Sequence, residues 1–475
     1  MSTTDGKRLA IIGGGPGGYS AAFAASDLGL EVTIIDIEPN PGGVCLYRGC
    51  IPSKALLHVA RVLTEAKEAE HWGIHFEQPS IELAKLRASK DAVVAKMTGG
   101  LGQLCKARKI KFVQGRASFE DSKTIKVAID NGKEQTITTD YTILAAGSRP
   151  VTLPDLFTES DRILNSTTAL QLADIPRNLL VVGGGYIGLE LGSVYASLRS
   201  SVTVVEMTDG LLPGADDDLV TVLTQRMEKI FRNIYLGTRV LGIKEKKDGI
   251  TVTLQSKDGK ERNETFDKVL VSIGRKPNSS GLGLNNTQVH VDARGFVEID
   301  AQRRTTDPAI YAIGDIAGEP MLAHKASHEG RVAAEAIAGR NTAFEPAAIP
   351  AVVFTDPEVA WCGLTERQAQ KDGRAINVAR FPWAASGRAT TLNRLDGLTK
   401  FITDPESGMV LGVGIVGPGA GELIAEGVLA IEMGATATDL GLSIHPHPTL
   451  SETLMESAEL IFGTGTHVYR PRKAN

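Results

Sequence analysis

The amino-acid sequence predicts an α/β protein built from two similar α/β units followed by a C-terminal α+β unit. The first observation is a repeat, because residues 9–36 and 179–206 share one pattern of strand, glycine-rich turn, helix and strand. The second is a change in the sequence pattern after Gly339, where a linker containing two prolines begins and no third copy of the repeat follows. The third is length, since 475 residues exceed one compact core and suit several domains of ~100–150 residues.

Composition excludes several classes of protein. With 51 Lys and Arg against 56 Asp and Glu, the net charge is −5, and no basic run suggests nucleic acid or an anionic membrane as a partner. No apolar stretch approaches the ~20 residues of a membrane span. Four cysteines are too few for a secreted disulfide scaffold, and the N-terminus resembles neither a signal peptide nor a transit peptide. We therefore expect a cytoplasmic protein.

Each copy of the repeat contains a Gly-x-Gly-x-x-Gly turn and ends on an acidic residue. The glycines and acids, at one common spacing, are Gly13, Gly15, Gly18 and Asp36 in the first copy and Gly183, Gly185, Gly188 and Glu206 in the second. Such glycines permit a tight turn, a close approach to pyrophosphate and close helix packing, so that the helix N-terminus faces the phosphates. The acid accepts hydrogen bonds from ribose hydroxyls and repels a 2′-phosphate. The pattern predicts two Rossmann-like dinucleotide sites, with FAD suited to Asp36 and NAD to Glu206; glycine-rich turns without a ligand are the alternative.

Later strands complete each unit. Residues 141–150 and 268–277 are apolar strands ending in Gly and Pro, and residues 123–129 alternate as in a small antiparallel excursion. Residues 308–318 form another strand that ends in a Gly-Asp turn at Asp315. This aspartate is placed to hold a sugar or ribityl hydroxyl, although it could equally cap the turn that follows.

Two cysteines stand at the start of a predicted helix. Cys45 and Cys50 are five positions apart, Pro52 suits a first helical turn, and apolar residues recur beyond it at helical spacing. A helix N-terminus stabilises a thiolate, and the intervening turn can bring the sulfurs together. Zinc would need further ligands that the neighbourhood lacks. A redox-active pair is favoured over a metal site or two inert thiols, whereas the isolated Cys105 and Cys362 are interpreted as packing residues.

Taken together, four motifs resemble the flavin disulfide oxidoreductases, class I of the pyridine nucleotide-disulfide oxidoreductases. They are the paired glycine motifs, GGVCLYRGCIPSK, MLAHKA and the C-terminal HPHPTLSE. The resemblance runs nearly end to end and points to the branch that oxidises dihydrolipoyl groups. Glutathione reductases usually have an Arg cluster where this chain has Glu206, and mercuric reductases add a C-terminal cysteine pair that this chain lacks.

The resemblance implies a homodimer with one non-covalent FAD per subunit, NAD as second cofactor and no metal. It implies electron transfer from protein-bound dihydrolipoyl groups to NAD⁺, with a lipoylated acyltransferase or a glycine-cleavage carrier protein as partner. The expected domains are listed in chain order: FAD-binding, 1–150; NAD-binding, 151–277; central and completing the FAD site, 278–345; and C-terminal α+β dimerisation, 346–475. The alternatives are an NADH-dependent reductase of another disulfide and a flavin-binding scaffold without turnover.

The resemblance also implies roles for individual residues. Cys45 exchanges with the substrate dithiol, and Cys50 lies against the flavin as a thiolate. Lys54 sits near flavin N5 and pairs with Glu190. Further cofactor contacts are expected from residues of both units, namely Gly147, Tyr186 over the flavin face, Gly274, Asp315 at the ribityl chain, Met321, Leu322, Ala323 and His324.

His447 and Glu452 are implied as base and orienter acting on the disulfide of the other subunit. A histidine near its ordinary pKa can take the dithiol proton, and a carboxylate fixes its tautomer. From the residues alone, however, Thr449 to Glu452 also reads as a helix capping box. His445 is the weaker candidate of the two histidines, and Lys54 by itself would be an ordinary solvated lysine.

One departure from the family pattern lies between the cysteines, where Tyr47 and Arg48 replace residues that are commonly small or neutral. A fixed positive charge there is expected to stabilise the thiolates and to raise the reduction potential of the pair.

Overall fold

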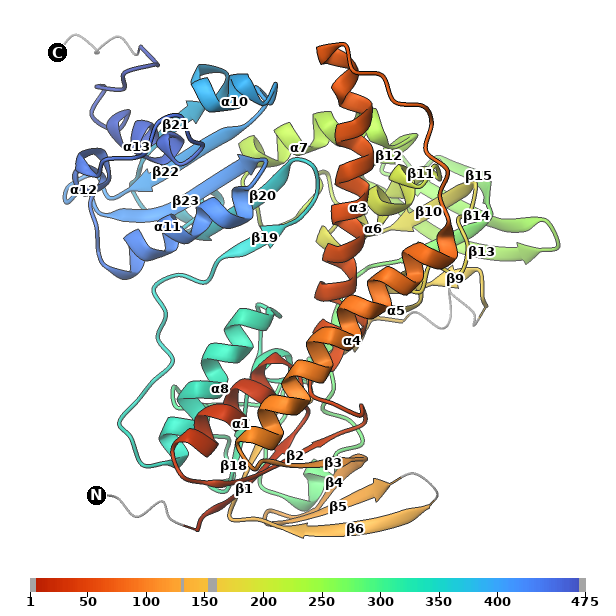
Figure 1. The fold of residues 1–475 in the computed structure, drawn as a ribbon, viewed down its shortest axis with the longest axis vertical. Coiled ribbons are helices and arrows are strands. Elements are labelled where there is room, and N and C mark those ends of the chain that lie inside the picture. The colour runs from red at the N-terminus through yellow and green to blue at the C-terminus, as the bar shows by residue number, and fades with distance from the viewer. Residues whose placement is uncertain (1–5, 130–131, 153–159, 470–475) are drawn as a thin grey trace.

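The computed structural model describes residues 6–129, 132–152 and 160–469. The ends of the expected first and last domains, residues 1–5 and 470–475, and residues 153–159 of the expected NAD-binding domain lie outside the described residues. Two parallel-sheet units and one antiparallel unit are arranged around two long helices (Figure 1). Within the described part, no helix is long and apolar enough to cross a membrane.

The first unit is a five-stranded parallel sheet formed by two separate parts of the chain. Its strands, in spatial order, are β18 (Ile310–Ala312), β7 (Tyr141–Leu144), β1 (Arg8–Ile12), β2 (Glu31–Asp36) and β3 (Lys111–Gln114). Helices α1 (Pro16–Asp27) and α8 (Ala323–Ile337) pack side by side (Figure 1). The excursion expected at residues 123–129 is an antiparallel sheet of β4 (Arg116–Asp121), β5 (Thr124–Ile129) and β6 (Lys133–Thr138). Because β18 pairs with β7, residues far along the chain complete the first sheet.

A long insertion between β2 and β3 carries the cysteine pair. It consists of α2 (Gly43–Arg48), α3 (Cys50–Glu68), the short 3-10 helix η1 (Ala69–Trp72) and α4 (Leu83–Ala107). Helix α3 begins at Cys50 itself, which confirms the predicted helix start. The insertion reaches the second unit, because α3 packs against α6 (Tyr186–Ser197).

The second unit repeats the first in register as well as in sequence. Leu9 pairs with Val32 across β1 and β2, and Leu179 pairs with Val202 across β10 (Asn178–Val182) and β11 (Ser201–Val205). The other strands of this parallel sheet are β12 (Asn233–Tyr235), β16 (Lys268–Val271) and β9 (Ile163–Leu164). Its remaining elements are α5 (Ser166–Ala169), α7 (Asp217–Ile230) and an antiparallel sheet of β13 (Thr238–Lys246), β14 (Gly249–Ser256) and β15 (Glu261–Phe266). Two short strands, β8 (Ser148–Pro150) and β17 (Arg275–Pro277), join the two units.

The C-terminal unit is an antiparallel sheet with helices. Its strands, in spatial order, are β19 (Ala351–Val353), β20 (Glu358–Gly363), β23 (Val410–Gly417), β22 (Leu398–Thr403) and β21 (Asn377–Pro382). Its helices are α9 (Glu366–Asp372), the 3-10 helix η4 (Trp383–Ala385), α10 (Gly387–Thr391), α11 (Ala420–Glu432), α12 (Ala437–Leu442) and α13 (Glu452–Glu459). Further 3-10 helices are η2 (Leu284–Asn286) and η3 (Gly314–Ala317) of the preceding region. The core of the unit includes the fully buried Trp383 and Phe401.

A buried lysine joins the second and third units. Lys400 on β22 is 1% exposed, and its ammonium lies 2.6 Å from Asp216 Oδ2, 2.8 Å from Asp218 Oδ1 and 2.9 Å from Glu366 Oε1. Burial disfavours the charge, but the hydrogen bonds to Asp216 and Asp218 outweigh burial and raise the pKa of Lys400. The three acids are close enough to hold a metal ion, but the Lys400 ammonium already lies among them and Arg380 also pairs with Asp218 and Glu366.

Lys400→Met is therefore expected to lower the free energy of unfolding by about 3–5 kcal/mol, because it leaves the buried Asp216 carboxylate without its cation. Urea unfolding followed by circular dichroism measures the effect. Lys257→Met is the matched control, since Lys257 pairs with Asp209 at the surface and exposed pairs contribute about 0–1 kcal/mol. Equal unfolding midpoints for the two variants would contradict this role of Lys400.

Candidate active site

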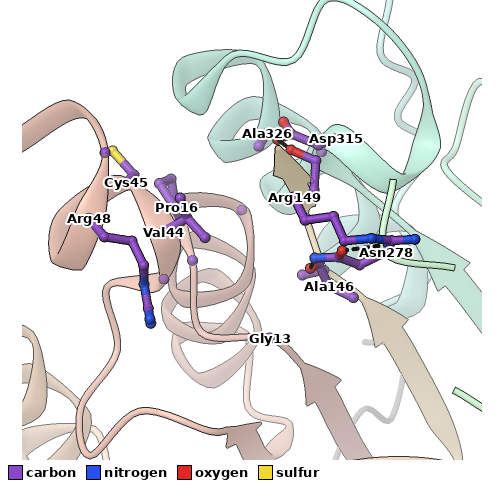
Figure 2. Close-up of a pocket in the computed structure, with 18 of the residues that line it drawn as sticks. Gly13, Pro16, Val44, Cys45, Arg48, Ala146, Arg149, Asn278, Asp315 and Ala326 are labelled. Carbon is purple, nitrogen blue, oxygen red and sulfur yellow. Dashed lines mark hydrogen bonds between the residues drawn. The ribbon is translucent and has the colours of Figure 1, made fainter. Parts of the chain in front are cut away.

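A cavity of about 680 Å³ opens between the first glycine turn, the cysteine helices and the start of η3. Figure 2 shows Gly13, Pro16, Val44 and Cys45 on one side of it and Ala146, Arg149, Asn278 and Asp315 on the other. Tyr186 and Glu190 of the second unit also line it. The volume lies in the range of small-molecule and cofactor sites.

The first glycine turn has the geometry that phosphate binding requires. Gly13 has φ +105°, and a Cβ there would lie 2.2 Å from the carbonyl oxygen of Ala145. A Cβ on Gly18 would lie 1.9 Å from the Gly13 carbonyl oxygen, whereas at Gly15 the nearest atom is 3.8 Å away. The open position therefore faces the cavity, and α1 begins at Pro16 with no side chain capping its N-terminus. These residues fit the diphosphate of FAD.

The second turn has the same construction. Gly183 has φ +107°, and a Cβ on Gly188 would lie 2.2 Å from the Gly183 carbonyl oxygen. Nothing lies within 4 Å of a Cβ on Gly185, and α6 begins at Tyr186 without a side-chain cap. The second turn therefore also leaves its helix N-terminus open for a diphosphate.

Both terminal acids close their own glycine loops, which the sequence analysis did not foresee. Asp36 accepts hydrogen bonds from Gly14 N and, at 2.9 Å, from Glu38 N. Glu206 accepts from Gly184 N at 2.7 Å and from Thr208 N at 2.8 Å. Each carboxylate oxygen has a second lone pair, so the expected contact with a ribose hydroxyl is compatible with these bonds.

Asp315 is held at the cavity by groups from three parts of the chain. Its Oδ2 accepts from Ser148 Oγ at 2.5 Å, and the same hydroxyl accepts from Arg275 Nε at 2.7 Å. Behind the turn, Gly314 N donates to Glu329 at 2.7 Å, and Glu329 is fully buried. Sequence reasoning missed Ser148, Arg275 and Glu329, although the first two stand next to Gly147 and Gly274 in the matching strand ends.

The other predicted FAD contacts are divided between the cavity and its surroundings. Gly147, Met321 and Ala323 line the cavity. Gly274 does not line it, although the next residue, Arg275, does. Leu322 is the N-cap of α8. The His324 imidazole lies 2.8 Å from the Pro350 carbonyl oxygen, so this side chain is engaged with the linker to the C-terminal unit.

The cysteine pair lies at the cavity, and both thiols are free. A hydrogen bond between the two thiols lowers the pKa of Cys50 to about 7; burial opposes this shift, and the charge of Lys54 supports it. The same hydrogen bond, together with burial, raises the pKa of Cys45. Cys50 is thus the more acidic thiol of the pair, and a large fraction of it is thiolate at neutral pH. Cys105 and Cys362 are buried, as expected for packing residues.

Cys45→Ala is expected to raise the pKa of Cys50 from about 7 toward the ~8.5 of an ordinary thiol. The hydrogen bond from Cys45 is the largest influence that lowers this pKa, and alanine removes the donor, whereas serine would replace it with a hydroxyl donor. A pH titration of the ultraviolet thiolate absorbance measures the midpoint, because the thiolate is lost as the pH falls through the pKa. Cys105→Ala serves as control, and an unchanged midpoint in Cys45→Ala would contradict the coupling.

Lys54 is fixed by an ion pair inside the site. Its ammonium lies 2.8 Å from Glu190 Oε2 and 4.5 Å from the ring centroid of Phe354. Glu190 is buried and also accepts from Ser53 Oγ at 3.2 Å and from Phe354 N at 2.9 Å. The pair is the one that the family resemblance implies, and the contacts of Ser53 and Phe354 are additions that sequence motifs did not reveal. All three units therefore meet at Lys54.

Tyr186, the first residue of α6, stands over the same region. Burial raises its pKa to about 12, so that the phenol is neutral at physiological pH. A neutral aromatic ring at the cavity is suited to stacking on a planar cofactor or nicotinamide ring.

His447 and Glu452 form a pair at the surface of the C-terminal unit. His447 Nδ1 lies 2.8 Å from Glu452 Oε1, while Oε2 of the same carboxylate accepts from Thr449 N at 2.8 Å. Although burial opposes ionisation, these bonds hold the pKa of Glu452 below its ordinary value. Glu452 thus orients the histidine and also holds the backbone of Thr449. The alternative of a capping box from Thr449 to Glu452 is wrong, because α13 begins at Glu452 itself, with Ser451 as an N-cap that makes no side-chain cap bond.

The two histidines of the motif differ in environment. His447 has a side chain that is 72% exposed, with Nδ1 donating to the carboxylate and Nε2 left as the base. His445 is 7% exposed, and its two ring nitrogens lie 2.8 Å from Glu426 and from the Ser443 carbonyl oxygen. His447 is therefore the histidine that can accept a proton from a substrate. It does not line the cavity, and α13 lies far from β1 and α1 (Figure 1).

The structure corrects the expectation for Arg48. Its guanidinium forms an ion pair with Glu38, and the side chain is directed away from the Cys45 sulfur (Figure 2). The charged groups that act on Cys50 are Lys54 and Glu190. The carboxylate of Glu38 pairs with this charge, and Arg48 is not among the main influences on the pKa of Cys45 or Cys50.

One dinucleotide loop and a cysteine pair share the cavity, and the helix that follows the second loop reaches it with Tyr186 and Glu190. This arrangement defines a dinucleotide-dependent redox protein that exchanges electrons with thiols. The model of the pyridine nucleotide-disulphide oxidoreductases matches residues 7–330, and the model of their dimerisation domain matches residues 349–458. The chain belongs to the pyridine nucleotide-disulphide oxidoreductase family.

Curated relatives and solved structures support this assignment. The chain is 50% identical to the dihydrolipoyl dehydrogenase of Haemophilus influenzae over 98% of its length and 97% of the relative's. It is 46% identical to that of Geobacillus stearothermophilus, over 96% and 97% respectively. The crystal structure of LpdA from Mycobacterium tuberculosis superposes with a TM-score of 0.89 at 28% identity, covering 96% of this chain and 99% of that one.

Proposed function

We propose that this protein is a flavin-dependent enzyme that oxidises protein-bound dihydrolipoyl groups and reduces NAD⁺ to NADH. The observation that carries the proposal is the low-pKa Cys50, held beside Cys45 and Lys54 at the cavity where the first glycine turn and α6 converge. The substrate class is supported by the near full-length similarity to curated dihydrolipoyl dehydrogenases.

In the oxidised enzyme, Cys45 and Cys50 form a disulfide. A thiolate of the substrate dithiol attacks Cys45, which forms a mixed disulfide and releases Cys50 as the thiolate. The second substrate sulfur then attacks the first, closing the lipoyl disulfide and releasing Cys45. His447 Nε2 takes the proton of the attacking thiol, and Glu452 stabilises the imidazolium.

The residues of the two glycine turns hold the cofactors. The first turn, Asp36 and Asp315 would bind the diphosphate, ribose and ribityl parts of FAD. FAD held there would supply the redox chemistry that links the cysteine pair to NAD⁺. The second turn and Glu206 would bind NAD, and a hollow of about 510 Å³ begins at Met207, directly after this acid. Lys54, fixed by Glu190, would place a positive charge beside the flavin, and Tyr186 would cover the face at which nicotinamide docks.

The active site is assigned to two subunits, because His447 and Glu452 are remote from the cysteines of their own chain. The C-terminal unit presents exposed apolar side chains, among them Leu442 and Ile444, which is 98% exposed. Exposed apolar groups of this kind are typical of protein interfaces. The proposed boundaries remain 1–150, 151–277, 278–345 and 346–475, and the proposed partners are lipoylated acyltransferases or glycine-cleavage carrier proteins. A cytoplasmic location is proposed as well, because four cysteines are too few for a secreted disulfide scaffold.

Anaerobic reduction of NAD⁺ by dihydrolipoamide, followed as NADH absorbance with the purified yellow protein, tests the function. We expect fast turnover with dihydrolipoamide and NAD⁺. In the reverse direction, turnover should be slow when NADPH replaces NADH or when a low-molecular-weight disulfide replaces lipoamide. A flavin that NADH reduces in a protein inactive with dihydrolipoamide would instead identify a reductase of another disulfide. A flavin that NADH cannot reduce would identify a scaffold.

A further inference from the structure

We propose that Arg48 is a positioning residue for the adenosine diphosphate half of FAD. The inference rests on the proposed function only in that FAD occupies the first dinucleotide site. It assigns to Arg48 a role in flavin retention, which is separate from the redox chemistry of the cysteines on either side of it.

Arg48 lies at the end of the cavity where Asp36, the acid of the first repeat, is located. Arg48, Glu38 and Asp36 all line the cavity, together with Gly115 and Arg116. Gly115 N donates to the Asp36 carbonyl oxygen at 2.8 Å, which places the start of β4 beside the acid. Because the acid after the second strand of such a unit faces the adenosine ribose, this end of the cavity is where the adenosine diphosphate half would lie.

The charges at this end require a cation when a diphosphate binds. The Glu38 side chain is only 17% exposed and Asp36 is half-buried, so two poorly solvated carboxylates face a ligand that itself carries negative charge. Arg48 pairs with Glu38, and its charge also acts on Asp36, whose pKa burial raises and Arg48 lowers. Without the guanidinium, both acids would repel the diphosphate.

Arg48 also retains donors that a ligand can reach. Its Nη2 is engaged with Glu38, but the side chain is 34% exposed and lines the cavity. A guanidinium presents several donors in a fixed fork that suits phosphate and ribose oxygens. An oxygen of the adenosine diphosphate half would accept a hydrogen bond from this group.

The test compares flavin affinities of the apoprotein reconstituted with FAD and with FMN, which lacks the adenosine half. We expect Arg48→Gln to weaken FAD binding by about 10–100-fold, as for the loss of a charge-assisted hydrogen bond, and to leave FMN binding unchanged. Arg48→Lys should recover part of the FAD affinity. Arg61→Gln is the matched control, because Arg61 lies on α3 outside the cavity and pairs with Glu65 at the surface; it should bind FAD as the unmodified protein does.

Unchanged FAD affinity in Arg48→Gln would overturn the inference, and so would an equal loss of FAD and FMN affinity, which indicates a general structural defect. A shift in the thiolate titration of Cys50 at constant FAD affinity would return Arg48 to the role of a redox tuner. An unmodified protein that binds FAD without oxidising dihydrolipoamide would contradict the proposed function but not this inference. A failure of the unmodified apoprotein to bind FAD would contradict both.

Discussion

Cys50→Ser is expected to abolish dihydrolipoamide-dependent reduction of NAD⁺ while FAD remains bound. Serine is close to cysteine in size, so α3 and the cavity wall should be preserved. The variant cannot form the disulfide that accepts the electron pair, because Cys45 is then the single described cysteine at the cavity and Cys105 and Cys362 are buried elsewhere. Loss of a covalent catalytic group lowers turnover by ~10⁴–10⁶-fold.

Absorption spectra separate this effect from loss of the cofactor. On reduction, the unmodified protein should show a long-wavelength band from the Cys50 thiolate against the flavin, and Cys50→Ser should lack this band at full flavin content. Cys105→Ser controls for the loss of a thiol elsewhere. If the band persisted in Cys50→Ser, the thiolate beside the flavin would have to be assigned to Cys45.

Much of the fold could be predicted because it depends on local patterns. The repeat at residues 9–36 and 179–206 specifies two strands, a turn and a helix in each copy, and the equal register of Leu9 with Val32 and of Leu179 with Val202 follows from it. The start of α3 at Cys50 was predictable for the same reason, since Pro52 and the apolar spacing act within a few residues.

The contacts that could not be predicted are long-range. Phe354 N donates to Glu190 from 164 positions away, and Ser148 bonds to Asp315 across 167 positions. No spacing rule links such residues. Arg48 shows a second limit, because its neighbours in sequence are the cysteines, whereas its partner Glu38 is brought to it by the fold between β2 and α2. A charge close in sequence therefore need not act on the group beside it.

His447→Ala is expected to reduce dihydrolipoamide-dependent turnover by the ~10²–10⁴-fold typical of a general base, without loss of FAD. The exposed imidazole, with Nδ1 held by Glu452 at 2.8 Å, is arranged to accept a proton at Nε2. Steady-state assays with dihydrolipoamide and NAD⁺ measure the loss of turnover, and the flavin absorbance measures the FAD that remains bound. His445→Ala is the control for the neighbouring position, and it should retain most of the turnover. Near-normal activity of His447→Ala would show that the residue is structural.

A mixed dimer tests which subunit supplies the base. Dimers of Cys45→Ser alone or of His447→Ala alone should both be inactive or nearly so. In a dimer with one subunit of each kind, the intact cysteine pair belongs to the His447→Ala chain, and the intact histidine belongs to the Cys45→Ser chain. If the base acts across the interface, these two meet in one complete site, and the mixed dimer should recover about half of the normal activity. If the histidine serves its own chain, neither site is complete and no activity returns. Recovery of activity would therefore show that catalysis requires the dimer. This result is expected because the histidine lies far from the cysteines of its own subunit.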